Sequence, residues 1–291
     1  WLTDVQCVRI KNIVSVVLLV SLASSAGLLV DRAAMLDTLK RVRVLLRALI
    51  ANFVIVPALA LLVARVYHLA NPVATGLLLM AMAPGVPFIM QAGGRKKGGS
   101  LELAIELTFI MAALSTFTIP FTARLLLPEG HSGSVSLGQL KALGLFQLLP
   151  LVLGALVTAL MPALAKKIIP YFKRLTLISM IAFFAIIAPQ TIRSFGILFG
   201  SFGVLAMLTV MILSLAVGWL AGGRRADYRH TLAIGTLLRN PGSAAVIATM
   251  FRSPAPEAVV LIYFVVQFVV AAFAGSFFKR ASPARPRSQT T

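Results

Sequence analysis

The chain has 291 residues, of which 59% are hydrophobic and only 12% are charged, and its formal net charge is +19. Soluble domains carry about 25% charged residues, so this composition excludes an ordinary soluble fold and predicts an all-α polytopic membrane protein whose first partner is the lipid bilayer. The basic residues occur in short clusters between long apolar runs, as in membrane-flanking loops, which argues against a nucleic-acid partner.

Nine apolar segments are each close to the length that crosses about 30 Å of hydrocarbon. The predicted transmembrane spans are residues 12–30, 44–66, 71–92, 101–126, 137–161, 172–190, 197–222, 231–250 and 256–278. We expect residues 1–11 to form an interfacial lead-in to the first span, and residues 162–171 to lie in a basic connection between the fifth and sixth spans.

The distribution of lysine and arginine predicts the orientation. With nine spans, 19 of the 27 basic residues flank one side of the membrane and seven flank the other, and Arg239 alone is assigned to neither side, because it lies in the middle of a span. Because Lys and Arg concentrate in cytoplasmic loops, the basic tail 281–291 is placed in the cytoplasm and the N-terminus outside. We therefore expect a multi-pass protein of the cell (inner) membrane.

Two predicted spans are interrupted by helix-breaking residues: APGVP lies within 71–92, and RNPG within 231–250. Proline removes a backbone donor and biases the preceding residue away from helical geometry. In hydrocarbon such a break persists only where protein or a watery cavity satisfies the freed backbone groups. The interruptions therefore supply candidate site residues, namely Pro84, Gly85, Pro87, Arg239, Asn240, Pro241 and Gly242.

Each interrupted span is followed by one long apolar span, 101–126 or 256–278. Spans one to four and six to nine then form two units that enter the membrane from opposite sides, which is the inverted-repeat pattern of transporters. We divide the chain into a first repeat at 1–126 and a second repeat at 127–280, with span five as an extra helix of the second. Matching interruptions in such repeats indicate the transport site.

Arg239 is the strongest candidate, because an ionisable residue at membrane depth is costly and commonly functional. Its charge would bind a carboxylate or sulfonate group, or would stand in for a coupling cation. In the structural alternative it pairs with Glu106 or reaches an interface. Helix N-termini at the breaks also attract anions, so we expect a small organic anion as substrate.

Polar residues near the breaks extend the candidate set. Glu106, the carboxylate expected within a span, would relay a proton or neutralise Arg239. Gln91 follows the first break and would either offer an amide to the site or end the helix. The hydroxyl of Thr108 is a weaker candidate, because hydroxyls in membrane helices more often bond their own backbone or pack helices.

The sequence resembles the bile acid:sodium symporter family and, more loosely, arsenite-efflux permeases. The similar segments are NFVIVPALA at 52–60, APGVP at 83–87, ALSTFTIP at 113–120 and RNPGSAAVIA at 239–248. The resemblance covers nearly the whole chain. It implies a core domain of two broken, crossing helices beside a panel domain, with the core built from spans two, three, four, seven, eight and nine. It adds four weaker candidates, which are Asn52, Ser115, Thr116 and Gln267.

The sodium ligands that the family resemblance implies carry over poorly to this chain. The family's glutamate falls on Gly235 and its glutamine on Arg239, while its Ser-Asn pair falls on Ile89 and Met90. A sodium site needs several hard oxygen ligands, and most of these positions are apolar. The sequence therefore argues against sodium coupling by the family's mechanism.

These observations predict a secondary transporter of a small organic anion, bile-acid-like or another carboxylate or sulfonate. Two rivals remain: a sodium-independent or proton-linked permease for another solute such as arsenite or a metabolite, and a transport-inactive membrane sensor of the same fold. An intramembrane enzyme would need a Ser/Lys, Asp/Asp or His/Glu constellation within the spans, and the sequence offers none. With one cysteine and three histidines in predicted connections, we expect no resident cofactor or metal site. Sodium and a proton are the two candidates for a coupling ion, although the sequence argues against sodium.

Overall fold

The computed structural model describes residues 4–29, 41–85, 98–127, 137–200, 202–251 and 255–281, and these residues form helices joined by short connections, with no β-strand. In chain order the elements are α1 (Asp4–Leu28), α3 (Val42–Ile50), the π-helix η2 (Ala51–Ile55), α4 (Val56–Val66), α5 (Asn71–Met82), α7 (Leu101–Leu126), α8 (Leu137–Leu160), α9 (Pro162–Gly200), α10 (Gly203–Ala221), α11 (Ala226–Leu237), α12 (Pro241–Ala248) and α13 (Ala255–Ala281).

Within the described residues, six helical stretches are long and apolar enough to cross a membrane. They are Arg9–Leu28, Val42–Val66, Leu101–Ile119, Pro162–Pro189, Gly203–Ala221 and Ala255–Phe278. Each overlaps a different predicted span. The other predicted spans correspond to α8, to α5 with residues outside the description, and to the pair α11 and α12. The total of nine spans remains a prediction.

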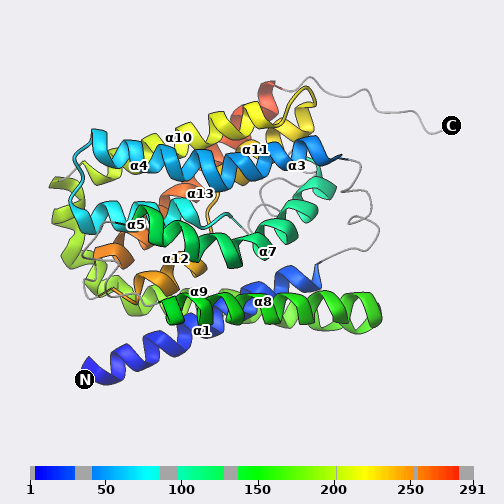
Figure 1. Cartoon of the computed structure of the whole chain (residues 1–291), viewed down its shortest axis with the longest axis horizontal. Helices are drawn as coiled ribbons and strands as arrows, with labels where there is room; N and C mark the ends of the chain where they lie inside the picture. Colours follow the sequence, from blue (N-terminus) through cyan, green and yellow to red (C-terminus); the bar gives the residue numbers. More distant parts are fainter. Residues whose placement is uncertain are drawn as a thin grey trace.

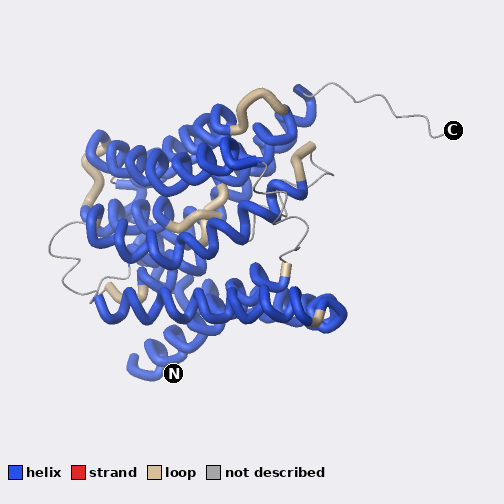
Figure 2. The backbone as a smooth tube through the Cα atoms, turned by 45° about the vertical axis from the view of Figure 1, so that its right-hand side comes forward, coloured by secondary structure: helices blue, strands red, loops and turns tan. Residues whose placement is uncertain are grey.

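The helices form two groups, which we call the panel helices (α1, α8 and α9) and the core helices (α3 to α7 and α10 to α13). The panel helices pack against one another, and α1 and α8 run along the lower edge in Figure 1, a separation that Figure 2 also shows. Glycine allows the close approach of α1 to α8: a Cβ on Gly27 would lie 2.2 Å from the carbonyl oxygen of Leu151. Small residues at such contacts are typical of packed membrane helices.

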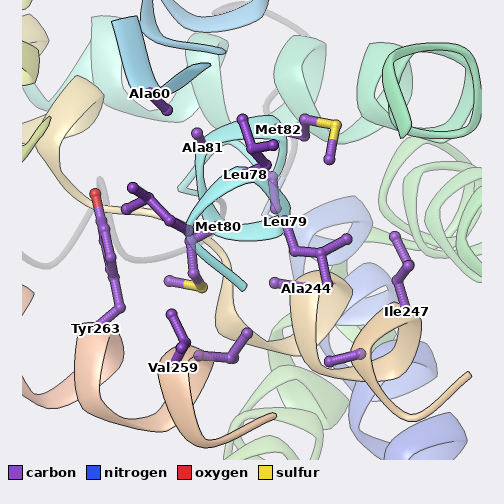
Figure 3. Packing of buried hydrophobic residues seen from close by; sticks show 14 of the residues in the cluster. Ala60, Leu78, Leu79, Met80, Ala81, Met82, Ala244, Ile247, Val259 and Tyr263 are labelled. Carbon is purple, nitrogen blue, oxygen red and sulfur yellow. The ribbon is translucent and has the colours of Figure 1, made fainter. Parts of the chain in front are cut away.

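Helix α5 lies at the centre of the core helices. Its residues from Val73 to Met82 are all buried, because α4, α12 and α13 pack around it. Figure 3 shows Met80 between α5 and Tyr263 of α13, and Leu79 above Ala244 of α12. An apolar sequence without a polar face suits a helix enclosed on all sides. The end of α5 at Met82 is therefore held deep inside the protein.

The predicted connection at 162–171 is wrong. Helix α8 ends at Leu160 and α9 begins at Pro162, so only Met161 separates them. Proline suits the first position of a helix, where its missing N–H costs no intrahelical bond. The lysines at 166 and 167 are exposed on α9, so this basic stretch is helical without being buried.

The predicted lead-in also differs from the structure, because α1 already begins at Asp4. On this helix Lys11 Nζ lies 2.6 Å from Oε1 of Glu257, in the first turn of α13. Both side chains are largely removed from solvent, so the pair joins a panel helix to a core helix. Glu257 is thus buried as well as Glu106, so the described residues include a second buried carboxylate.

The turn from α10 to α11 is closed by glycine and an ion pair. Gly223 adopts φ +71°, a left-handed conformation that favours glycine. Arg225 then donates to both carboxylate oxygens of Asp227, at 3.1 and 2.6 Å. Burial alone would raise the pKa of Asp227, but the hydrogen bond and charge of Arg225 outweigh it and lower that pKa below its ordinary value. Further along α11, His230 is buried beside Phe278, so it does not lie in a connection.

Candidate functional site

The first predicted helix break is present at residues 83–85. Helix α5 stops at Met82, and Ala83 adopts extended geometry with φ −98° and ψ 94°. The cause is local, because Pro84 disfavours helical geometry at the residue before it. Gly85 follows with no space for a side chain, since a Cβ there would lie 1.8 Å from the carbonyl oxygen of Leu238. Pro87 and Gln91 lie outside the described residues.

The second break is present at residues 238–240. Helix α11 ends at Leu237, Leu238 is extended with φ −72° and ψ 126°, and α12 begins at Pro241. Asn240 is also extended and caps α12, because its Oδ1 accepts hydrogen bonds from the backbone N–H groups of Gly242 and Ser243 at 3.0 and 3.4 Å. An Asn cap followed by proline is a strong helix start. The N–H groups at this terminus are therefore already occupied.

The two breaks meet, and we call this meeting point the crossing. Pro84 and Arg239 form an antiparallel bridge, and the N–H of Asn240 donates to the carbonyl oxygen of Ala83 at 3.0 Å. Each unwound segment thus satisfies backbone groups that the other leaves free, as hydrocarbon surroundings require. On the panel side, Gly242 packs against Leu22 of α1.

The backbone of Arg239 is fixed by an amide from α13. Its N–H donates to Oε1 of Gln267 at 2.7 Å, and Nε2 of Gln267 donates back to its carbonyl oxygen at 3.3 Å. Both residues are fully buried. The Gln267 side chain therefore replaces the helical hydrogen bonds that the backbone N–H and C=O of Arg239 have lost. This contact explains why a polar side chain is buried at position 267.

The guanidinium of Arg239 donates hydrogen bonds to a single residue, Asn52, in the second predicted span. Its Nη1 donates to Oδ1 of Asn52 at 3.0 Å, and its Nη2 donates to the carbonyl oxygen of Asn52 at 3.4 Å. Asn52 is held in turn, because its Nδ2 donates to the carbonyl oxygen of Ala48 and to Thr236 Oγ1. Asn52 and Arg239 therefore form one buried polar cluster across the two elements.

The π-helix explains why the Asn52 carbonyl is available. In this turn the N–H of Val56 bonds to the carbonyl oxygen of Ala51, five residues back, instead of to Asn52. The next residue along the helix is Pro57, which has no N–H. The Asn52 carbonyl is left without its usual helical donors, and the guanidinium takes their place. The spacing of Asn52 and Pro57 was the sequence signal for this arrangement.

The charge of Arg239 is not matched by a carboxylate among the described residues. The side chain is 0% exposed, and its Nε makes no hydrogen bond to a described residue. The structure brings Glu106 instead to Arg41, with Oε1 3.3 Å from Nη1, so Glu106 does not neutralise Arg239 here. A buried charge held only by neutral groups is energetically costly and commonly functional in a membrane protein.

The predicted hydroxyls on α7 do not join this cluster. Thr108 donates to its own helix at Ala104, and both Ser115 and Thr116 donate to the carbonyl oxygen of Ala112. Ser115 also accepts a hydrogen bond from Gln147 of α8 at 2.8 Å, which joins a core helix to a panel helix. These three side chains therefore serve helix packing in this conformation.

One residue near the crossing had no sequence signal. Tyr263 lies one turn before Gln267 on α13, is fully buried, and its hydroxyl makes no hydrogen bond to a described residue. An aromatic residue in an apolar span does not by itself indicate a site. Across the described residues, no group of three His, Cys, Asp or Glu side chains is arranged to hold a metal ion.

Comparison with known protein families matches residues 16–196 to the sodium bile acid symporter family. The chain belongs to this family. The match covers the first break and Asn52, whereas Arg239 lies beyond its end. This is a family of transporters, in keeping with the long apolar helices of the chain.

Curated relatives are distant and longer. The P3 protein of Mus musculus is 25% identical over 157 residues, which is 51% of this chain and 32% of that protein. The P3 protein of Homo sapiens is 26% identical over 137 residues, 44% of this chain and 28% of that protein. The chain thus spans only about a third of the length of these relatives.

Proposed function

We propose that the chain is a secondary transporter that moves a small organic anion, bile-acid-like or another carboxylate or sulfonate, by alternating access. The observation that carries the proposal is the crossing, where two interrupted helices meet beside a fully buried arginine. Interrupted helices at membrane depth are the construction that transporters use for substrate sites. Family membership supports the same class of protein.

The charge of Arg239 is the reason for proposing an anion. A fixed cation without a carboxylate among the described residues makes the crossing electropositive, and an anion bound nearby would compensate it. The N-terminus of α12 adds its dipole, although Asn240 occupies the N–H groups of Gly242 and Ser243. The attraction would therefore come from the guanidinium and the dipole, and only to a small extent from free backbone donors.

The movement would be that of the core helices relative to the panel helices. The crossing lies beside the panel at Gly242 and Leu22, and the Lys11–Glu257 pair joins α1 to α13. The two breaks would belong to inverted repeats at 1–126 and 127–280, since each is followed by a long helix, α7 or α13. We place the C-terminus in the cytoplasm on the charge distribution.

Thermal unfolding of the purified protein in detergent, screened against organic carboxylates and sulfonates, tests this function. We expect a subset of anions to raise the unfolding temperature in a saturable way, because a ligand that binds only the folded state stabilises it. The same anions should then accumulate in proteoliposomes that contain the protein, and not in empty liposomes.

Other outcomes would select a rival. Stabilisation by arsenite or by neutral metabolites, with none by organic anions, would favour a permease for another solute. Saturable stabilisation by anions without any uptake into proteoliposomes would favour a membrane sensor that has lost transport. Either result would contradict the proposed function.

A further inference from the structure

Within the described residues, the Arg239 guanidinium donates hydrogen bonds to two oxygens of a single residue. These are the side-chain Oδ1 and the main-chain carbonyl oxygen of Asn52. Both are neutral, hard oxygens, the type that replaces the hydration shell of a small cation. A structural arginine at this depth would ordinarily have a carboxylate partner, and the described residues provide none.

The local fold frees one of these oxygens. The π-turn diverts the N–H of Val56 to Ala51, and Pro57 has no N–H to offer, so the Asn52 carbonyl is released from the helix. Asn52 lies within one continuous helical stretch, Val42–Val66, and its carbonyl is freed by the π-turn. Carbonyls that are free of helical hydrogen bonds are a usual source of ligands for coupling cations in transporters. The two Asn52 oxygens are therefore arranged like the ligands of a bound cation, and the group that they contact is the guanidinium of Arg239.

From these observations we propose that the Arg239 guanidinium is a resident monovalent cation. It fills, from within the protein, a cation position at the crossing that the oxygens of Asn52 line, so that the anion site is electropositive without any cation from solution. The prediction that anion transport needs no cation from solution rests on the proposed function. The prediction that a cation position exists does not rest on it, because cation binding can be measured on the folded protein without any transport.

Two buried polar groups near the crossing argue against a purely structural role for the contact between Arg239 and Asn52. The Nε of Arg239 and the hydroxyl of Tyr263 are both fully buried, and neither makes a hydrogen bond to a described residue. A contact selected only for stability would satisfy such groups, because a buried polar group without a partner destabilises the fold. Their presence points to a site that binds a ligand.

Chemical rescue of the variant Arg239→Ala tests the proposal. This change removes the guanidinium and leaves the Asn52 oxygens in place. Its unfolding temperature should fall below that of the wild type and should recover saturably with millimolar guanidinium or methylguanidinium, with ionic strength held constant by choline chloride. Arg65→Ala, at an exposed arginine of α4, is the matched control. Its unfolding temperature should equal that of the wild type, and guanidinium should not raise it.

The variant Arg239→Gln provides a second measurement, since its amide can still donate to Asn52 if the alanine variant does not fold. With the resident charge gone, we expect sodium to raise its unfolding temperature while leaving the wild type unchanged. Its uptake of the anion should become about tenfold higher in sodium than in choline.

Two results would overturn the proposal. One is a loss of stability in Arg239→Ala that guanidinium and methylguanidinium do not reverse, together with an Arg239→Gln variant whose stability ignores sodium. The other is a wild-type protein that sodium itself stabilises. If the wild type carries out no uptake at all, the proposed function fails, whereas the unfolding measurements still decide whether the cation position exists.

Discussion

Asn52 and Arg239 show how one buried charge is held by a few neutral atoms. The guanidinium is kept in place by the side chain and the carbonyl of Asn52, and its backbone by the amide of Gln267. None of these groups carries a charge that could neutralise it. The stability of the crossing should therefore depend strongly on each neutral partner, and above all on Asn52.

Replacing Asn52 with leucine should lower the free energy of unfolding by about 1–3 kcal/mol, because the change removes Oδ1 and leaves a buried, charged donor without its side-chain acceptor. Denaturant unfolding in detergent micelles measures the loss. Asn71→Leu, at an exposed asparagine at the start of α5, is the control and should change stability by less than about 0.5 kcal/mol. Equal losses in the two variants would contradict the role given to Asn52.

Gly85→Ala should disrupt the crossing, because the new Cβ would lie 1.8 Å from the backbone oxygen of Leu238, which cannot move aside without moving the second break. We expect a loss of at least about 1–3 kcal/mol, as for overpacking in a close-packed interior. Gly275→Ala in α13 is the matched control, since its Cβ would meet no atom within 4 Å. A Gly85→Ala variant as stable as Gly275→Ala would show that the two breaks are not in close contact.

At the scale of elements, the sequence predicted both helix breaks because their causes are local. Pro84 and Pro241 each act on the residue immediately before them, and this needs no tertiary information. The π-turn was not predicted, although Pro57 marks it, because its stability depends on a donor that lies 187 residues away in the chain. The helical stretch at 162–171 was missed because its basic residues indicated a loop, whereas they lie on exposed positions of α9.

The Lys11–Glu257 pair offers a test of how α1 is attached to α13. Lys11→Met should lower the free energy of unfolding by about 3 kcal/mol, because it leaves the buried Glu257 carboxylate without its cation. The double variant Lys11→Met, Glu257→Leu should recover most of that loss, since it removes both charges. Arg9→Met, at an exposed position on the same helix, should have little effect. A double variant that loses as much as the two single variants combined would mean that the pair does not interact.

The Arg225–Asp227 pair predicts a small dependence of stability on pH. Because the folded-state pKa of Asp227 is lowered, the pair stabilises the fold above about pH 4 and loses its effect as the pH falls through the folded pKa. Asp227→Asn should therefore be less stable than the wild type at pH 7, by under about 1 kcal/mol for so exposed a pair. Unfolding curves measured at pH 7 and again at a pH below the lowered folded-state pKa should show that the difference disappears. A difference that persists there would have another cause.

At the scale of the whole molecule, the crossing lies where the core helices meet the panel helices. Composition and hydropathy were enough to predict a helical membrane protein, because apolar length is a property of the sequence alone. The family was predicted from the resemblance of four short segments, and the family match confirms it. The partners of the charged residues were not predictable. Glu106 pairs with Arg41 and Arg239 with Asn52, and such choices depend on how distant helices pack. The inverted repeat and the substrate remain proposals.

If Arg239 makes the crossing electropositive without a cation from solution, anion transport by the wild-type protein needs no sodium. Initial rates of anion uptake into proteoliposomes, measured with external sodium and then with choline in its place, test it most directly. The wild type should show the same initial rate in both media. A wild-type rate that falls about tenfold or more in choline would contradict it.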